Sequence, residues 1–561
     1  MARIIPTGAQ SFVKLRQRNL FYVDKTKFIQ EWWECEDDVT LITRPRRFGK
    51  TLMLDTVNTF FSLTYAGRND LFEGLEIWNS EKFRILQGKI PVIFLSFSDI
   101  KCKNYKNLCI SINDSLVNIY NYFRTILNFD LLLDTEKYQF NSVPQDMPEV
   151  IATKSIKNLS TYLTRQFGVK PIVLLDEYDT PMQEAWISGY WDEAVRFFSS
   201  FFNSTFKTNE NIERGLMTGI TRISKESLFS DLNNLEVVTT TSERYADCFG
   251  FTEDEVFAAM DEYGLADRDE VRRWYDGFIF GTAKGIYNPW SIIGYLKHRR
   301  FASYWAQTSS NAMVGQIIGS AEREVKEQAE DLLQGKSIAV HLDEQIVFSQ
   351  LHDKEGAVWS FLMAAGYVKP LRFDPASGMY ELALVNREVL SIMEDLVSGW
   401  FNGPRACGGD FRKALLAGDL DDMNELMSDI AENTFSFFDT GGRKPERFYH
   451  AFVLGLIVDL KGRYEIVSNR ESGLGRCDVM LFPLRKGDRG IVIEFKTMRP
   501  RKEKSLEDTC ASALRQIADK RYADALAARG VARNAIYAYG FGFRGKEVLI
   551  TGGACPPCAS R

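Results

Sequence analysis

The stretch from Val39 to Thr51 constrains the fold of this chain most strongly. A short apolar run typical of a buried strand leads into a loop with one proline and three arginines, which closes in Gly49-Lys50-Thr51. The helical pattern Leu52 to Phe61 follows at once. Backbone N–H groups at a helix start bind phosphate oxygens, a lysine reaches the β- and γ-phosphates, and a hydroxyl coordinates Mg²⁺. The stretch therefore has the chemistry that a nucleoside triphosphate requires.

This loop departs from the usual phosphate-binding loop at one position. The usual loop has glycine where this chain has Arg44, so Gly49 is the glycine that remains to let backbone approach phosphate. Taken alone, the stretch is equally compatible with a basic turn between a core strand and a core helix. A second signal is needed to decide between the two interpretations.

The second signal is Pro171 to Asp179, PIVLLDEYD. Four apolar residues run into Asp176 and Glu177, which predicts that Asp176 lies at the carboxyl end of a buried strand, where open α/β sheets bind ligands. An Asp there can hold Mg²⁺ through water, and the adjacent Glu can polarise the water that attacks the γ-phosphate. Exposed acids that cap a strand are the ordinary alternative. Together with the upstream loop, the pair predicts ATP and Mg²⁺ as cofactors.

Further strand-like and helical patterns complete a predicted α/β domain. The apolar run 90–97 is typical of a parallel strand buried on both faces, and 105–127 and 156–167 read as helices. Residues 128–150 show no periodicity and are expected to be a loop or an insertion. The run 214–222 predicts one more strand, whose polar end makes Thr221 and Arg222 candidates for sensing the γ-phosphate; an arginine on a solvated loop is the alternative.

The length of 561 residues exceeds what one hydrophobic core usually organises, so several domains are expected. Glycine and proline at 441–445 mark the clearest boundary in the second half. The predicted organisation is a P-loop domain at 1–249, a small helical lid at 250–298, a mostly helical middle region at 299–440, a C-terminal domain at 441–550 and a tail at 551–561.

Composition excludes some functions and leaves others open. A net charge of −6 carries no global signature of nucleic-acid binding, so such contacts must come from local patches. No apolar run reaches the roughly 18 residues of a membrane span, and the N-terminus does not resemble a signal peptide, so we expect a cytoplasmic protein with no membrane partner. The nine cysteines are scattered, and the pair Cys555 and Cys558 is expected to belong to a tail rather than to a zinc site.

The last domain shows the order αβββαβ. A helix is expected at 446–460, three strands at 463–468, 477–482 and 490–496, a long helix at 506–528 and a final strand at 535–541. Asp478 lies on the second strand, and period-two alternation points Glu494 and Lys496 to one side of the third. Two acids can bind Mg²⁺ or Mn²⁺ beside a phosphodiester while the lysine orients water, although an ion pair at a strand end is a common alternative.

A local basic excess supports a phosphate-binding role for this domain. Residues 485–533 carry 13 Lys or Arg against 7 Asp or Glu, and a basic run follows Lys496 directly. Such a run beside a metal site suits a nucleic-acid backbone, whereas most charge runs are only solvated faces.

Seven motifs together resemble one known family. They are Tyr22–Thr26, Thr43–Thr51, Leu175–Pro181, Trp274–Gly277, Tyr287–Trp290, Ser468–Gly473 and Ile493–Lys496. The combination is similar to bacterial AAA-ATPase-like proteins that end in a PD-(D/E)XK nuclease domain, and it covers nearly the whole chain. The resemblance implies an α/β P-loop ATPase of the additional-strand type, related to archaeal and signal-transducing ATPases, joined to a restriction-endonuclease-like domain. In that family an arginine-rich loop replaces the glycine-rich one.

Carried over by position, the resemblance implies roles for individual residues. Lys50 and Thr51 bind phosphate and magnesium, Asp176 is the Walker B acid and Glu177 the hydrolytic acid. The nucleotide-binding set also takes in Gly49, Arg46, Arg47 and Arg222.

In the nuclease-like domain the same comparison makes Asp478 and Glu494 metal ligands and Lys496 their catalytic partner. His450 is similar to a histidine on the first helix of this domain that some members use as an extra metal ligand. Gln516 and Tyr522 match a glutamine and a tyrosine on the following helix, and Glu471 is an additional candidate acid.

Three functions are compatible with these features. The first is an ATPase module that gates metal-dependent cleavage of nucleic acid, with DNA favoured over RNA. The alternative is a switch of the signal-transducing ATPase type (STAND-like), whose C-terminal domain binds nucleic acid or a partner without cleaving. The third is a scaffold with neither activity. A homo-oligomer is left open.

Overall fold

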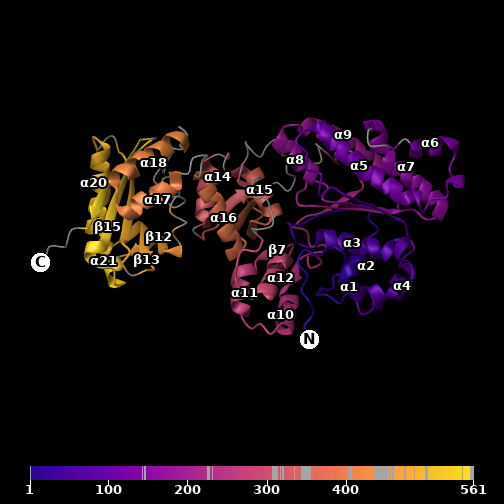
Figure 1. Cartoon of the computed structure of the whole chain (residues 1–561), viewed down its shortest axis with the longest axis horizontal. Coiled ribbons are helices and arrows are strands. Elements are labelled where there is room, and N and C mark those ends of the chain that lie inside the picture. The colour runs from indigo at the N-terminus through magenta and orange to yellow at the C-terminus, as the bar shows by residue number, and fades with distance from the viewer. Residues whose placement is uncertain are drawn as a thin grey trace. The chain divides into compact units, whose positions relative to one another are not determined.

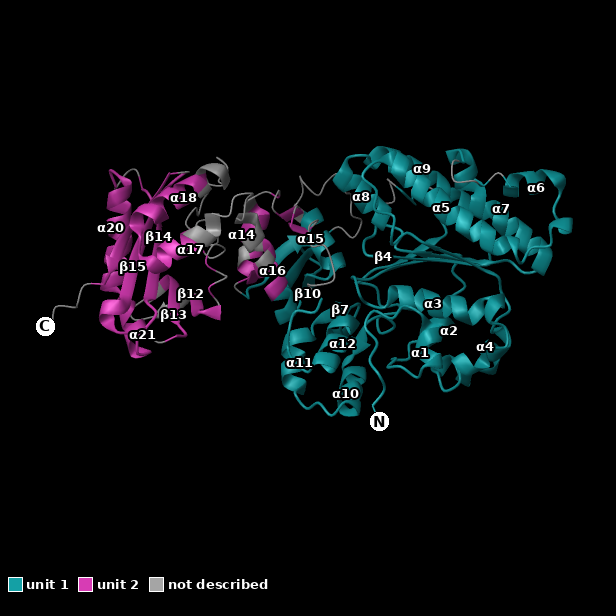
Figure 2. Cartoon of the chain, viewed as in Figure 1, with its two compact units in different colours: residues 1–313, 335–390 teal, residues 314–334, 391–561 magenta. Residues whose placement is uncertain are grey.

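The computed structural model divides the chain into two compact units, residues 1–313 with 335–390 and residues 314–334 with 391–561 (Figure 2). The residues that it describes are 2–141, 143, 147–223, 228–229, 232–305, 314–315, 317–318, 321, 323–333, 335–342, 355–401, 407–434, 453, 457, 460, 462–472, 475–485, 487–499, 503–545 and 547–555.

The first unit is built on a five-stranded parallel sheet with the strand order β2-β3-β4-β1-β5. The strands are β1 Val39–Thr43, β2 Val92–Ser96, β3 Ile172–Asp176, β4 Arg214–Gly219 and β5 Leu235–Val238. Strand β4 lies between β1, which leads into the arginine-rich loop, and β3, which ends in Asp176. This inserted strand confirms the predicted additional-strand type of P-loop fold.

Helices cover both faces of this sheet. Figure 1 shows α1 to α4 on one side of the strands and α5, α7, α8 and α9 on the other. Their bounds are α1 Phe12–Gln17, α2 Lys27–Glu34, α3 Lys50–Phe61, α4 Glu81–Leu86, α5 Tyr105–Arg124, α7 Glu149–Phe167, α8 Thr180–Ser188 and α9 Trp191–Phe202. Every residue of β1, β3 and β4 is buried as a result. This two-sided cover explains why these strands read as continuous apolar runs rather than as alternating ones.

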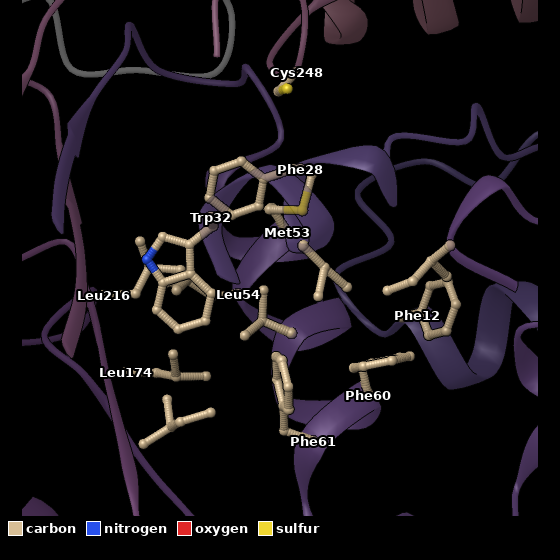
Figure 3. Close-up of a cluster of buried hydrophobic side chains, with 14 of the residues drawn as sticks. Phe12, Phe28, Trp32, Met53, Leu54, Phe60, Phe61, Leu174, Leu216 and Cys248 are labelled. Atoms are coloured by element: carbon tan, nitrogen blue, oxygen red, sulfur yellow. The ribbon is translucent and has the colours of Figure 1, made fainter. Parts of the chain in front are cut away.

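The core under α3 holds the phosphate loop in place. Trp32 of α2 and Leu54 and Phe61 of α3 pack in one cluster with Leu174 of β3 and Leu216 of β4 (Figure 3). All five side chains are at most 1% exposed. Burying a large apolar side chain contributes about 1.5–3 kcal/mol, so the helix that begins at the loop is firmly tied to the sheet.

Two features of this domain differ from the sequence prediction. Residues 128–150 were expected to be a loop or an insertion without periodicity, but they contain the helix α6 (Asp134–Asn141). Its low apolar periodicity follows from exposure, because only one of its residues, Phe140, is buried. The short strand β5 was not predicted either, since four residues are too few for a pattern.

Residues 250–298, expected to form a small helical lid, contain short strands as well as helices. The elements are β6 Phe251–Thr252, α10 Glu253–Glu262, α11 Arg268–Tyr275, β7 Phe278–Phe280, β8 Ala283–Tyr287 and α12 Pro289–His298. The strands β7 and β8 pair antiparallel and form a hairpin. Asn288 caps α12 by accepting hydrogen bonds from the backbone N–H groups of Trp290 and Ser291 at 2.9 and 3.4 Å.

The middle region, expected to be mostly helical, also contains a sheet. Strands β9 (Ile338–His341), β10 (Val368–Asp374) and β11 (Met379–Leu384) form an antiparallel sheet of order β10-β11-β9. The helices that the structure describes in this region are α14 Arg323–Leu333, α15 Glu355–Ala365, α16 Arg387–Phe401, α17 Cys407–Ala417 and α18 Leu420–Thr434. The strands escaped detection because their faces are only partly buried and show little alternation.

Glu388 is a buried carboxylate at the start of α16. Its residue is 1% exposed, and its oxygens accept hydrogen bonds from the Ser291 hydroxyl and the Trp305 backbone N–H, both at 2.7 Å. Both donors are neutral, and burial raises the pKa of Glu388 to about 7.

We expect Glu388→Gln to raise stability above neutral pH. Because the folded pKa lies above the unfolded one, wild-type stability falls as pH rises from about 4.5 to about 7, by roughly 3 kcal/mol at most. The neutral amide removes that loss. Thermal unfolding of wild type and variant at pH 5 and pH 8 measures this loss of stability. The control is Glu210→Gln, at an exposed position. Equal pH dependence in Glu388→Gln and wild type would contradict the assignment.

The second unit contains a five-stranded mixed sheet of order β12-β13-β14-β15-β16. The strands are β12 Tyr464–Ser472, β13 Gly475–Pro483, β14 Gly490–Thr497, β15 Ile536–Arg544 and β16 Glu547–Ala554, with α20 Leu506–Asp519 and α21 Ala523–Ala528 between β14 and β15. The β14–β15 pair is parallel and the others are antiparallel. The predicted sequence of three strands, helix and strand is therefore present, with the long helix interrupted at Arg521, whose φ is +58°.

Both ends of this unit extend beyond the predicted domain limits of 441 and 550. Strand β16 continues through Ala554, where a tail was expected. Gly552 and Gly553 make the strand read as coil, yet a Cβ on Gly552 would lie 2.0 Å from the Ala538 carbonyl oxygen, so the close strand contact requires glycine. On the N-terminal side, α17 and α18 share a core with the sheet through Phe411 and Met427.

Candidate functional sites

The phosphate loop connects β1 to α3 with a left-handed turn. Arg47 has φ +69° and Gly49 has φ +84°. At Gly49 a side chain would meet nothing within 4 Å, so the positive φ rather than space explains the glycine. The loop thereby brings the N-terminus of α3, a site with unsatisfied N–H groups and positive partial charge, to the carboxyl edge of the sheet.

Lys50 is buried inside this loop. Its Nζ donates hydrogen bonds to the carbonyl oxygens of Arg44 and Pro45, at 2.8 and 2.9 Å. Burial lowers the pKa of Lys50 to about 8, while Glu177, Asp179 and Asp176 act in the opposite direction. A buried cation that is hydrogen-bonded to neutral carbonyls would bind more strongly to an anionic partner such as a phosphate.

Thr51 and Asp176 meet at the edge of the sheet. The Thr51 hydroxyl donates to Asp176 Oδ2 at 2.7 Å, and the Thr218 hydroxyl on β4 donates to Oδ1 at 2.6 Å. Asp176 is fully buried, and burial raises its pKa. This hydroxyl and carboxylate are the donor types that hold Mg²⁺ next to a triphosphate, so the residues present fit that ion.

Glu177 has a left-handed backbone, with φ +53°, directly after the buried strand. Its Oε2 accepts a hydrogen bond from the Thr180 hydroxyl at 3.1 Å. Such a conformation is uncommon for a residue other than glycine, and it is frequent at functional sites. The turn separates the side chains of Asp176 and Glu177, so that Asp176 stays buried while Glu177 lines an open cavity.

A cavity of about 560 Å³ lies in front of the loop, within the size range of small-molecule sites. Of the residues predicted to bind or hydrolyse nucleotide, six line it: Arg46, Arg47, Gly49, Lys50, Thr51 and Glu177. Asp176 lies behind Thr51. Arg222 is not among the lining residues, and burial leaves its Nε without a hydrogen-bond partner in the described part of the chain.

The other part of the cavity is apolar and aromatic. It is lined by Phe21, Tyr22, Val23, Phe251 and Trp290. The first three come from the segment before α2, the helix that precedes the loop strand. Aromatic residues such as Phe21 and Tyr22 near a nucleotide can stack on its base. Trp290 comes from α12 and its ring lies 4.4 Å from the Arg47 guanidinium carbon, a cation–π distance that only the tertiary structure could reveal.

Arg44, which stands where the usual phosphate loop has glycine, is a buried structural residue. It is 0% exposed, and its guanidinium donates to the carbonyl oxygens of Thr43 and Thr239, at 2.9 and 2.6 Å. The guanidinium carbon also lies 4.6 Å from the ring centre of Phe280. The position of Arg44 in the loop did not predict this structural role, because its partner Thr239 comes from a distant segment.

The second candidate site is on the α20 side of the C-terminal sheet. Alternation places Asp478 and Glu494 on the same face as Met480 and Val492, which pack with residues of α20 and α21. The Glu494 side chain is 2% exposed, and its Oε1 accepts hydrogen bonds from Lys496, at 3.2 Å, and from Gln516 of α20. The structure therefore brings together the predicted acids, the lysine and the glutamine.

Glu494 has one oxygen atom available. Its Oε2 is buried without a hydrogen-bond partner among the described residues. Burial, followed by the nearby Asp478 carboxylate, raises the pKa of Glu494 to about 7. An orphaned carboxylate oxygen beside a second carboxylate fits a divalent cation, which would stabilise both charges. Asp478 Oδ2 also accepts the Phe495 backbone N–H at 2.9 Å, which fixes its orientation.

His450 lies outside the residues that the structure describes, as does Cys558, and the side chain of Glu471 is not described. Within the described residues, no group of three or more His, Cys, Asp or Glu side chains is arranged to hold a metal ion.

Tyr522 is 0% exposed and packs in the same cluster as Val492. No helix that the structure describes is long and apolar enough to cross a membrane.

Comparison with known proteins agrees with this two-site architecture. Residues 6–229 match the family model "Predicted AAA-ATPase", and residues 444–552 match the model "PD-(D/E)XK nuclease superfamily". An uncharacterized protein in the vnfD 5' region of Azotobacter chroococcum mcd 1 is 26% identical over 549 residues, which is 94% of each chain.

Among solved structures, the Aeropyrum pernix ORC2 protein in its ADPNP and ADP complexes aligns with 66% of this chain and 92% of that chain. The TM-score is 0.22 and the identity 10%, values at which the likeness supports no argument about this chain. The family matches and the sheet topologies lead to one conclusion: this chain combines an N-terminal AAA-ATPase-like domain with a C-terminal domain of the PD-(D/E)XK nuclease superfamily.

Proposed function

We propose that this protein binds and hydrolyses ATP, and that its ATPase domain gates a metal-dependent nuclease-like domain that acts on DNA. The observation that carries the proposal is the orphaned, buried Oε2 of Glu494 beside Asp478 and Lys496, in a chain that also has a complete phosphate-loop cavity. A buried carboxylate with a raised pKa and a charged partner is typical of a catalytic site.

In the ATPase domain each residue has one task. Lys50 would bind the β- and γ-phosphates in place of its present carbonyl partners, and Thr51 and Asp176 would hold Mg²⁺. Glu177 orients the attacking water, and Arg46 and Arg47 contribute positive charge next to the phosphates. When bound there, Mg²⁺ would supply positive charge beside the transferred phosphoryl group.

In the nuclease-like domain Asp478 and Glu494 would hold the divalent ion, Mg²⁺ or Mn²⁺, and His450 is a further candidate ligand. The ion supplies Lewis-acid polarisation of the phosphodiester when bound. Lys496 is positioned by its ion pair with Glu494 to orient water and to stabilise negative charge on the phosphate. Gln516 holds the Glu494 carboxylate in place.

A cleavage assay tests this function directly. Plasmid or single-stranded DNA is incubated with protein, Mg²⁺ or Mn²⁺, and either ATP, a non-hydrolysable analogue or no nucleotide. We expect metal-dependent cleavage whose rate changes by about 10-fold or more with nucleotide, the size of an ordinary allosteric coupling. Cleavage that persists unchanged in Asp478→Ala or Lys496→Ala would rule out this site.

The non-cleaving switch predicts a different result. ATP would still raise the unfolding temperature, because a ligand that binds only the folded state stabilises it. No DNA would be cut with any metal or nucleotide, and binding of DNA would be the remaining readout. Absence of both stabilisation by ATP and cleavage would leave only a scaffold.

A further inference from the structure

The last acid of the Asp-Glu-Tyr-Asp motif, Asp179, has no role in the mechanism above, yet its Oδ2 accepts four hydrogen bonds from described residues. It is 1% exposed and lies where the loop after β3 enters α8. Its Oδ2 accepts from the backbone N–H groups of Ile220 and Thr221, at 3.0 and 2.9 Å, and from the Thr221 hydroxyl at 2.7 Å. The loop after β3 thereby holds the segment that follows β4.

Tyr178 reinforces this attachment. Its hydroxyl donates to the Thr221 carbonyl oxygen at 2.7 Å and accepts the Ile223 backbone N–H at 3.0 Å. The segment from 220 to 223 is therefore fixed by two neighbouring side chains of the motif. The Thr221 hydroxyl is engaged by Asp179, so the arrangement does not use Thr221 as a direct phosphate sensor.

Asp179 also connects to the cavity. Gln183, one turn along α8, donates its Nε2 to Asp179 Oδ2 at 3.0 Å, and its Oε1 accepts from an Arg46 guanidinium nitrogen at 3.5 Å. Both Gln183 and Arg46 line the cavity in front of the phosphate loop. A continuous chain of hydrogen bonds thus runs from Arg46 through Gln183 and Asp179 to Thr221.

A glycine makes this close packing possible. A Cβ on Gly219, the last residue of β4, would lie 2.8 Å from Asp179 Oδ1 and 2.6 Å from a ring carbon of Tyr178. Its φ is not in the left-handed region, so the need for glycine comes from space alone. The end of β4 therefore packs directly against Tyr178 and Asp179, and a residue larger than glycine at position 219 would not fit there.

We infer that Asp179 is a positioning residue for ATP hydrolysis: through Gln183 it orients Arg46 on the phosphate loop, and through Thr221 it fixes the strand end that carries Arg222. This inference rests on the proposed ATPase function. Small displacements of groups around a reacting phosphate lower the rate of the chemical step far more than ground-state binding. Loss of Asp179 is therefore expected to act on kcat rather than on ATP affinity.

Two substitutions at Asp179 separate hydrogen bonding from other effects. Asp179→Asn keeps one carbonyl oxygen at the Oδ2 position and places its amide where Oδ1 now has no partner, so we expect kcat within about 3-fold of wild type. Asp179→Ala removes all four bonds, and we expect kcat to fall about 10- to 100-fold while the ATP Kd changes less than about 3-fold. Rescue by Asn distinguishes positioning from a need for the negative charge beside Lys50.

Milder variants keep the test valid if Asp179→Ala does not fold. Thr221→Val removes one hydroxyl, Gln183→Leu breaks only the arm to Arg46, and Gly219→Ala displaces the carboxylate without changing it. Each should lower kcat by a smaller factor with ATP affinity retained, in protein whose unfolding temperature is measured in parallel.

The opposite results overturn the inference. They are wild-type kcat in folded Asp179→Ala, an Asn variant as defective as the Ala variant, or equal losses in kcat and ATP affinity. Wild-type protein is assayed in the same series. If wild type hydrolyses no ATP, the proposed function fails and this inference falls with it; if wild type hydrolyses ATP and the variants match it, only the inference fails.

Discussion

Lys50→Ala should weaken ATP binding about 10- to 100-fold and remove hydrolysis, because a charge-assisted contact to the phosphates is lost that contributes about 1.5–3 kcal/mol. The same change is not expected to unfold the nucleotide-free protein. Lys50 is a buried cation whose pKa burial lowers to about 8, so its removal also ends an unfavourable desolvation. Titration calorimetry with ATP and Mg²⁺ measures the affinity, and thermal unfolding without nucleotide measures the stability.

Lys101→Ala is the matched control for this change. Lys101 lines the same cavity but comes from the loop after β2, is exposed and belongs to no predicted phosphate contact. Its affinity for ATP should remain within a few-fold of wild type. Wild-type affinity in Lys50→Ala would show that the cavity does not bind triphosphate in the way proposed.

Glu494→Gln should abolish metal-dependent DNA cleavage while stabilising the metal-free protein. The carboxylate is a proposed metal ligand, and an amide cannot replace its charge. In the absence of metal, however, burial and Asp478 raise the pKa of Glu494 to about 7, so the ionised form is disfavoured in the folded state. Removing the charge therefore relieves a penalty above pH 7. A variant that is more stable and inactive distinguishes a functional group from a structural one.

The pH dependence follows from the same shift. Below the folded pKa the Glu494 carboxyl is protonated, and the proton competes with the metal ion for this group. Apparent metal affinity and cleavage should therefore rise with pH up to about 7 and then level off. Cleavage at limiting Mn²⁺ between pH 5.5 and 8.5 measures this profile. Glu507→Gln, an exposed acid at the start of α20, is the control and should keep the wild-type profile. A flat wild-type profile at limiting metal would contradict the assignment of Glu494.

Much of the N-terminal domain could be predicted because its signals are local. The apolar run of β1, the Gly-Lys-Thr turn and the run of β3 into Asp176 each lie within one short segment, and the longer parallel strands buried on both faces read as continuous apolar runs. The C-terminal order of strands and helix was predictable for the same reason. Period two alone was enough to place Glu494 and Lys496 on one side of β14.

Long-range partners decided the rest. Arg44 and Arg46 are separated by one residue in sequence, yet Arg44 is buried on the carbonyl of Thr239 and Arg46 lines the cavity. No local rule distinguishes them, since the partner segments come from far along the chain. The middle sheet of β9, β10 and β11 likewise depends on a pairing between strands whose own sequence patterns are weak.

The sequence by itself determined that a phosphate loop, an acidic strand end and a second pair of acids occur in one chain, because each is a short motif with its own chemistry. Only the tertiary structure decided which groups act together: that Trp290 of the lid stacks on Arg47, that Gln516 reaches Glu494, and that Asp179 spans two strand ends. The physical reason is that side-chain contacts across a fold depend on packing between distant elements, which a local pattern does not contain.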